Sequence, residues 1–196
     1  MGWPVFMNFL RQFRAAPNLL TLLRLFIIPF LVIAILGGRF RSAFALFVLA
    51  GVSDGFDGLV ARWTRQHTRL GQYLDPIADK LLLSTLFVVL THMGLVPRYV
   101  TVLVFSRDLG ILLIATLLFA TGTLRDFRPS LLGKLNTLAQ IVGLTVVLVE
   151  QIAPSANAGL LREGLLRAIS VLAPISAAQY AWIVFRRMNA PEPMVE

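Results

Sequence analysis

The chain contains no cysteine among its 196 residues, which excludes disulfide bonds, thiolate metal sites and thiol nucleophiles. Charged residues are also scarce. They make up 14% of the sequence, whereas about a quarter is usual in soluble domains. Hydrophobic residues make up 57% of the chain. At a length typical of one domain, this balance indicates a protein that lies in a membrane.

Acidic residues are the scarcer charged class, with 10 Asp and Glu against 18 Lys and Arg, so the net charge is +8. In a soluble protein, this excess would suggest nucleic acid as a partner. Here the basic residues lie mostly between apolar runs, where they determine topology and contact anionic lipid. We therefore expect membrane lipid as a partner, and no nucleic acid.

Long apolar runs dominate the rest of the sequence. A membrane-spanning helix needs roughly 20 mostly apolar residues. The runs that reach this length are about 17–38, 41–62, 72–95, 98–122, 132–152 and 165–186. We predict an all-α bundle of six transmembrane helices over residues 17–187, with a disordered tail at 188–196. The Lys and Arg bias of the connecting segments predicts that both termini face the cytoplasm.

The segment before the first run, residues 1–16, has a different pattern. Phe6, Phe9 and Phe13 recur at helical spacing on one face, and Arg11 and Arg14 lie opposite. This pattern is typical of an amphipathic helix that lies in the membrane interface.

Two pairs of aspartates lie where a membrane protein has few charges. Asp54 and Asp57 are three residues apart at the end of the second run, and Asp75 and Asp79 are four apart at the start of the third. On helices, each pair shares a face. A hairpin through residues 63–70 would bring both pairs to one membrane depth. Each charge there costs roughly 2.5–3.5 kcal/mol on insertion scales, so we expect it to have a structural or functional role.

Four converging carboxylates require cations, because like charges otherwise drive some of them to protonate. Oxygen ligands suit Mg²⁺ or Mn²⁺, and two such ions would suit phosphoryl transfer. Each pair also has an ordinary explanation. Asp75 before Pro76 could be a helix N-cap, Asp54 and Asp57 could cap or end their helix, and Asp79 with Lys80 could be an interfacial charge pair.

Small residues accompany the acidic pairs. Gly58 and Ala61 leave room beside Asp57 and Arg62 for a flat ligand, and Gly71 opens the third run. A glycine inside a helix costs about 1 kcal/mol relative to alanine, so a ligand or a close helix contact is expected there.

The whole pattern reads Asp54-x-x-Asp57-Gly58-x-x-Ala61-Arg62, eight residues, then Gly71-x-x-x-Asp75-x-x-x-Asp79. It resembles, without departure, the signature of the CDP-alcohol phosphotransferases. The resemblance implies a membrane enzyme that displaces CMP from a CDP-linked lipid, and a homodimer. It also implies metal ligation by Asp54, Asp57, Asp75 and Asp79, with Asp79 also the general base. Contacts to the cytidine diphosphate would come from Gly58, Ala61, Arg62 and Gly71.

The opening of the first run, Pro17 to Arg24, is similar to that of phosphatidylglycerophosphate synthases and of cardiolipin synthases that use CDP-diacylglycerol. Asn18 and Thr21 are three apart, and we expect them to face the nucleotide. An ordinary polar helix start explains them equally well. Arg24 lies one turn deeper, where it either pairs with a motif carboxylate or carries a phosphate.

Further cations lie near membrane depth. We predict that Arg107 and Lys134 bind a phosphate on the acceptor, with Arg187 as a weaker candidate. The ordinary alternative pairs Arg107 with Asp108 and places Lys134 at the interface, with its charge reaching water.

The acceptor expected first is glycerol 3-phosphate, because the opening of the first run and Gly133-Lys134 resemble the enzymes that use it. Phosphatidylglycerol is the alternative, since Asp108 stands where those enzymes more often have glutamate. Inositol phosphate or another alcohol is a third possibility. Outside enzymes, an ion-coupled transporter would also place carboxylates in a membrane. We expect the bacterial inner membrane, with the active site facing the cytoplasm.

Overall fold

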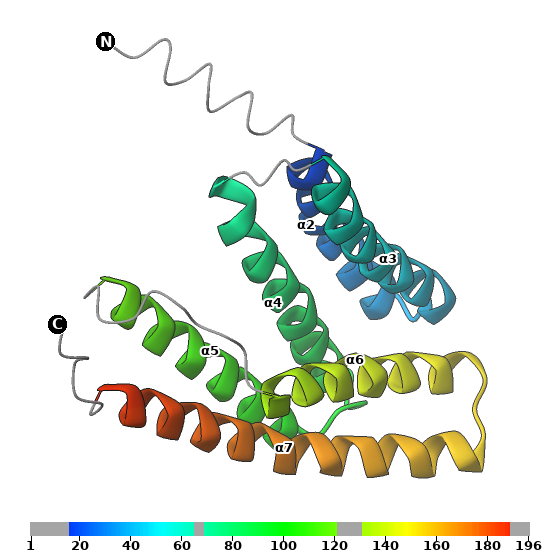
Figure 1. Cartoon of the computed structure of the whole chain (residues 1–196). Coiled ribbons are helices and arrows are strands. Elements are labelled where there is room, and N and C mark those ends of the chain that lie inside the picture. The colour runs from blue at the N-terminus through cyan, green and yellow to red at the C-terminus, as the bar shows by residue number, and fades with distance from the viewer. Residues whose placement is uncertain (1–15, 65–68, 121–130, 189–196) are drawn as a thin grey trace, which may run out of the picture. The chain divides into compact units, whose positions relative to one another are not determined.

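The computed structural model describes residues 16–64, 69–120 and 131–188 of the chain. Side chains are described for residues 21–53, 77–114, 116 and 131–186. The described residues form six helices and no strand (Figure 1). They are α2 (Ala16–Leu36), α3 (Phe40–Thr64), α4 (Arg69–His92), α5 (Arg98–Ala120), α6 (Leu131–Ile152) and α7 (Ala156–Met188).

The helices form two compact units. The first contains α2, α3, α4 and the last residues of α6, and α2 packs against both α3 and α4. One face of α2 is enclosed, with buried side chains at helical spacing: Thr21, Arg24, Ile27, Leu31, Ala34 and Ile35. A second stripe on α2 is exposed and apolar: Leu23, Phe26, Phe30 and Ile33. A helix that is apolar on both its enclosed and its open face is typical of a lipid environment.

Glycine turns end two helices of this unit. At the end of α2, the Arg39 N–H donates to the Ala34 carbonyl at 2.8 Å and the Gly38 N–H donates to the Ile35 carbonyl at 2.9 Å. Gly38 has φ 67°, a conformation that costs little only without a Cβ. This is a Schellman motif, and it reverses the chain directly into α3. Gly94, with φ 75°, ends α4 with the same pair of hydrogen bonds.

The second unit contains α5, most of α6 and α7. α5 packs against α7, and Tyr180 and Val184 of α7 form a cluster with Ile111 and Ile114 of α5. α6 approaches α7 closely at Gly143, where an added Cβ would lie 2.8 Å from the Ile169 Cδ1 atom. The short connection between α6 and α7 makes these two helices antiparallel.

Two of the helices are long and apolar enough to cross a membrane by length and composition: Leu131–Ile152 and Ala156–Arg186. Shorter apolar helical stretches occur at Thr21–Leu36 and Phe40–Ser53. Large apolar side chains on the open faces of these helices, such as Phe26, Leu138 and Trp182, are more than half exposed. An apolar exterior of this extent suits lipid rather than water.

The prediction of six helices is confirmed, and five of them begin and end close to the predicted runs. The sixth begins at Ala156, well before the predicted start at about 165. Its first turns are polar, so the length of the apolar run does not reveal them. Ser155 caps them by accepting the Ala158 N–H at 3.1 Å. The predicted interfacial helix at 1–16 lies almost wholly outside the described residues. The same holds for the predicted tail at 188–196, of which only Met188, the last residue of α7, is described.

Candidate active site

The acidic motif lies on two uninterrupted helices. Asp54 and Asp57 are followed by further turns of α3, which ends at Thr64. Asp75 and Asp79 are preceded by six residues of α4, which begins at Arg69. Asp75 is therefore no N-cap, and Asp54 and Asp57 do not end their helix. The explanations of Asp75 as a cap and of Asp54 and Asp57 as a helix end are therefore wrong, and each pair shares a helix face as the spacing predicted.

The α2–α3 hairpin brings the first acidic pair to the depth of Arg24. At 1.5 Å per residue, Arg24 lies about 18 Å before the end of α2, and Asp54 lies about 21 Å after the start of α3. The difference is less than one helical turn. Asp54 of α3 and Arg24 of α2 are thus at nearly one level in this unit, and Asp57 lies about one turn further along α3.

A direct contact brings α4 to the same level. Arg24 Nη1 donates to Asp79 Oδ1 at 2.6 Å, across 55 residues of sequence. The Arg24 side chain is fully buried, whereas the Asp79 side chain is 43% exposed. Of the two roles predicted for Arg24, the structure places it with a motif carboxylate. Asp79 is consequently held from one side by a buried cation and is open on another.

Thr21 and Asn18 lie on α2, toward its start from Arg24. Thr21 is fully buried on the stripe that contains Arg24. α2 and α4 run parallel because the chain reverses direction twice between them, once before α3 and once after it (Figure 1). Thr21 lies about one turn before Arg24 on α2, and Asp75 lies about one turn before Asp79 on α4. Because the two helices are parallel, both offsets point in the same direction. The side chain of Asn18 lies outside the described set.

The donor set suits a hard cation. No three His, Cys, Asp or Glu side chains among those described converge on one point. Of the four motif carboxylates, however, only Asp79 is in that set. The backbone aligns both acidic pairs along helix faces, and all four groups are oxygen donors, which Mg²⁺ and Mn²⁺ prefer. The residues present therefore fit divalent metal ions. Gly58, Ala61, Arg62 and Gly71 are helical, and their side chains lie outside the described set.

A second polar site lies in the other unit. Arg107 Nη1 donates to Asp108 Oδ1 at 2.5 Å, and Arg107 Nε donates to the Ser176 hydroxyl at 3.2 Å. All three residues are more than nine-tenths buried. The alternative that pairs Arg107 with Asp108 is therefore observed. This pairing leaves a compact polar group inside an otherwise apolar helix pair.

Two buried amides belong to the same layer of the unit. Asn136 and Gln140 are one turn apart on α6, and both are fully buried. Asn136 precedes the Gly143–Ile169 contact by two turns, and Ser176 follows it by two turns on the antiparallel α7. Asn136 and Ser176 therefore lie at one level. We call Arg107, Asp108, Asn136, Gln140 and Ser176 the buried polar layer.

The amides of this layer have unmet hydrogen-bonding capacity. The side-chain nitrogen and oxygen of both Asn136 and Gln140 are buried without a hydrogen-bond partner in the described part of the chain. Sequence reasoning missed Gln140 and Ser176 as site residues. A signal for Gln140 existed, since it follows Asn136 by one turn on an apolar helix. A single serine in α7 gave none.

Lys134 stands apart from this layer. It is exposed near the start of α6, and no hydrogen bond or ion pair joins it to Arg107. An exposed lysine at a helix start agrees with the interfacial alternative. The side chain of Arg187 lies outside the described set.

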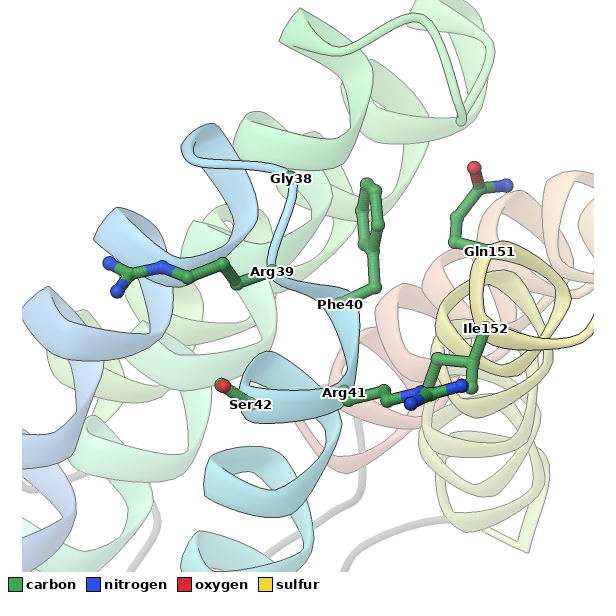
Figure 2. Close-up of a pocket in the computed structure, with 7 residues that line it drawn as sticks. All are labelled: Gly38, Arg39, Phe40, Arg41, Ser42, Gln151 and Ile152. Atoms are coloured by element: carbon green, nitrogen blue, oxygen red, sulfur yellow. The ribbon is translucent and has the colours of Figure 1, made fainter.

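A surface pocket of about 440 Å³ lies at the opposite end of α2 and α3 from the motif. Figure 2 shows its lining at the α2–α3 turn, where Arg39 and Arg41 point in different directions. Gln151 and Ile152 of α6 complete the wall. It contains none of the predicted site residues, so the motif rather than this pocket identifies the active site.

The model of the CDP-alcohol phosphatidyltransferase family matches residues 14–182. The chain belongs to this family. The match spans α2 to α6 completely and α7 up to residue 182, and it includes every residue of the acidic motif. CDP-alcohol phosphatidyltransferases generally depend on a divalent metal, in keeping with the donor set above.

Relatives of this chain have two kinds of name. The chain is 35% identical over 144 residues to rat "Cardiolipin synthase (CMP-forming)", covering 64% of this chain and 47% of that protein. It is 38% identical over 133 residues to "Probable phosphatidylglycerophosphate synthase" of Mycobacterium tuberculosis, covering 65% and 62%. It is 30% identical over 151 residues to "CDP-diacylglycerol--glycerol-3-phosphate 3-phosphatidyltransferase" of Bacillus subtilis, covering 69% and 77%. The matched region thus spans about half of the rat protein and more of the bacterial ones.

Proposed function

We propose that this phosphatidyltransferase moves the phosphatidyl group of CDP-diacylglycerol to a hydroxyl of glycerol 3-phosphate and releases CMP. The observation that carries the proposal is the complete acidic motif on two uninterrupted helices, within a chain that matches the family along its length. The names of the Mycobacterium tuberculosis and Bacillus subtilis relatives support glycerol 3-phosphate as the acceptor.

The chemistry assigns separate roles to the residues. The acceptor oxygen forms a bond to the phosphorus that carries diacylglycerol, the bond from that phosphorus to CMP breaks, and CMP leaves. Asp79 accepts the proton of the acceptor hydroxyl, because its carboxylate is accessible and fixed in place. Arg62 holds the diphosphate, and Gly58, Ala61 and Gly71 give the nucleotide room, with Asn18 and Thr21 beside it.

Metal ions complete the site. Asp54, Asp57, Asp75 and Asp79 would hold two Mg²⁺ or Mn²⁺ ions. Bound there, such ions neutralise charge on the diphosphate and on the leaving phosphate.

The buried polar layer supports a polar acceptor. Arg107 offers a cation for the acceptor phosphate, and the amides of Asn136 and Gln140 offer donors and acceptors that glycerol hydroxyls would satisfy. Lys134 and Arg187 are the further cations that we assign to this acceptor. Arg107 can bind the phosphate only if some of its N–H donors remain available after it pairs with Asp108. A guanidinium has five N–H donors, so both contacts are possible.

Phosphatidylglycerol is the second candidate acceptor. Asp108 next to Arg107 and the match to the rat cardiolipin synthase favour it. Both candidate acceptors carry a glycerol hydroxyl and a phosphate, so one polar layer suits either. We also propose a homodimer in the bacterial inner membrane, with both termini and the site on the cytoplasmic side.

The test is CMP release by the full chain in detergent, with CDP-diacylglycerol, Mg²⁺ and one of four additions: glycerol 3-phosphate, phosphatidylglycerol, inositol phosphate or no acceptor. We expect release that requires both Mg²⁺ and glycerol 3-phosphate. Release only with phosphatidylglycerol would assign the second candidate. Absence of release from folded protein with every acceptor would reject the proposal, and ion flux in liposomes without a CDP-lipid would favour the transporter.

A further inference from the structure

The pair formed by Arg24 and Asp79 has unequal partners. The guanidinium of Arg24 is fully enclosed by protein, whereas the carboxylate of Asp79 is 43% exposed. By comparison, the ion pair of the second unit encloses both of its partners, since the side chains of Arg107 and Asp108 are 7% and 6% exposed. The contrast indicates that Asp79 has a task on its open side.

We propose that Arg24 is a positioning residue for Asp79: its buried guanidinium holds one carboxylate oxygen and thereby fixes the direction in which Asp79 meets the acceptor hydroxyl. This inference rests on the proposed function, in which Asp79 is the general base. Arg24 is not assigned contact with any substrate.

The register of the helices explains how the contact is held. Leu31 and Ile35 follow Arg24 on the enclosed stripe of α2, and Leu86 and Leu90 follow Asp79 on α4 with the same spacing. All four are 0–1% exposed. Two parallel apolar stripes of equal spacing fix the axial position of α2 against α4. The Arg24–Asp79 contact lies at the end of these two stripes. The packing of the core therefore also fixes the position of Arg24 relative to Asp79.

The chemistry of the side chain also favours a positioning role. The planar guanidinium of arginine fixes the directions of its N–H donors. A lysine ammonium would supply the charge without the direction. To bind a substrate phosphate, the other role predicted for Arg24, the protein would have to open around a guanidinium that is 0% exposed and bonded to Asp79.

The first test compares the wild-type chain with Arg24→Gln, Arg24→Lys and the control Arg39→Gln in the CMP-release assay. Arg39 is an exposed arginine of the same unit, at the far end of α2. Misplacing a catalytic group by about 1 Å costs about 100-fold in rate. We expect Arg24→Gln to lower kcat about 100-fold per folded molecule, with KM for CDP-diacylglycerol and glycerol 3-phosphate within about threefold.

Arg24→Lys should retain more activity than Arg24→Gln, and Arg39→Gln should match the wild type. Two results would overturn the inference. A raised KM for glycerol 3-phosphate with kcat preserved would mean that Arg24 carries the acceptor phosphate. A kcat per folded molecule that is unchanged in both Arg24 variants would mean that the pair only stabilises the fold. If Arg24→Gln does not fold, Arg24→Lys decides.

The second test needs no activity. Thermal unfolding in detergent is measured for Arg24→Gln, Asp79→Asn and the double variant, which form a double-mutant cycle. We expect the double variant to lose clearly less melting temperature than the sum of the two single losses, because the residues act through one contact. Additive losses would refute the coupling. If the wild type releases no CMP with any acceptor, the proposed function fails, yet this cycle still determines whether the pair is coupled.

Discussion

Buried arginines mark the two polar sites at the scale of single residues. Arg24 and Arg107 are each more than nine-tenths buried, and each donates to a carboxylate. Removing one partner of such a buried pair usually costs more than the pair itself contributes, because a charge is left in a poor solvent. Both arginines are therefore sensitive places to test the function.

The motif aspartates should separate by role. Asp79→Asn should lower CMP release by about 10²–10⁴-fold, the range of general-base catalysis, and leave binding of CDP-diacylglycerol intact. Asp57→Asn should lose metal and activity together, because an amide is a weaker ligand for Mg²⁺. The measurements are CMP release across a Mg²⁺ titration and protection from thermal unfolding by CDP-diacylglycerol. Near-normal rates in either variant would show that the roles are assigned wrongly.

Arg107 should determine affinity for the acceptor. Arg107→Gln removes a charge-assisted hydrogen bond worth about 1.5–3 kcal/mol, so KM for glycerol 3-phosphate should rise about 10- to 150-fold. KM for CDP-diacylglycerol should stay unchanged. The matched control is Ser176→Ala, which removes the 3.2 Å contact but keeps the cation and should have a much smaller effect. Equal KM values for both variants and the wild type would remove Arg107 from the acceptor site.

At the scale of residues, the sequence identified most of the candidate site residues. It did not identify which of them contact each other. The aspartates and Arg24 were identifiable because charge is costly in a membrane. The partner of Arg24 was not, because 55 residues separate it from Asp79 and the register of α2 against α4 depends on packing. Gln140 and Ser176 were missed for a related reason. Neutral polar side chains are common in membrane helices, and only burial distinguishes these two.

At the scale of elements, the turns that end α2 and α4 depend on glycine. Both Gly38 and Gly94 have positive φ, and an added Cβ at either would meet no atom within 4 Å. Any loss of stability caused by a side chain there would therefore come from backbone strain and not from a clash with a neighbouring atom. The lengths of the helices follow from apolar runs and were predictable, whereas the early start of α7 depends on the Ser155 cap and was not.

Gly38→Ala and Gly51→Ala should have opposite effects on stability. Gly38→Ala forces a Cβ into the left-handed conformation and should cost about 1–2 kcal/mol. Gly51 also has no atom within 4 Å of an added Cβ, but it lies inside α3, where alanine should stabilise by about 0.5–1 kcal/mol. Thermal unfolding of both variants in detergent is the measurement. A shift of the same sign in both would contradict the role of Gly38 in the turn.

The whole molecule is defined by its apolar exterior. Large apolar side chains are exposed on every described helix, and the chain belongs to a family of lipid-modifying transferases. The number of membrane crossings and their direction were predicted from run length and from Lys and Arg bias, and they stay predictions. Labelling of introduced cysteines tests both predictions.

Because the chain has no cysteine, a single introduced cysteine reports the side of the membrane without background. In intact cells, Ser155→Cys should react with a membrane-impermeant maleimide, since the α6–α7 turn faces outward in the predicted topology. Thr64→Cys, at the end of α3, should react only after the cells are opened. The reverse pattern would place both termini outside, and labelling of both in intact cells would reject the assignment of crossings.

The pairing of Arg24 with Asp79 has a consequence for how the protein is made. α2 leaves the ribosome with its arginine well before α4 brings the aspartate, because the whole of α3 is synthesised between them. Each charge alone opposes entry into the bilayer by roughly 2.5–3.5 kcal/mol, whereas the pair is neutral. If both helices cross the membrane as predicted, the arginine of α2 enters the bilayer at a lower cost once α4 has brought its aspartate. The two helices joined by this contact would then depend on each other for membrane insertion.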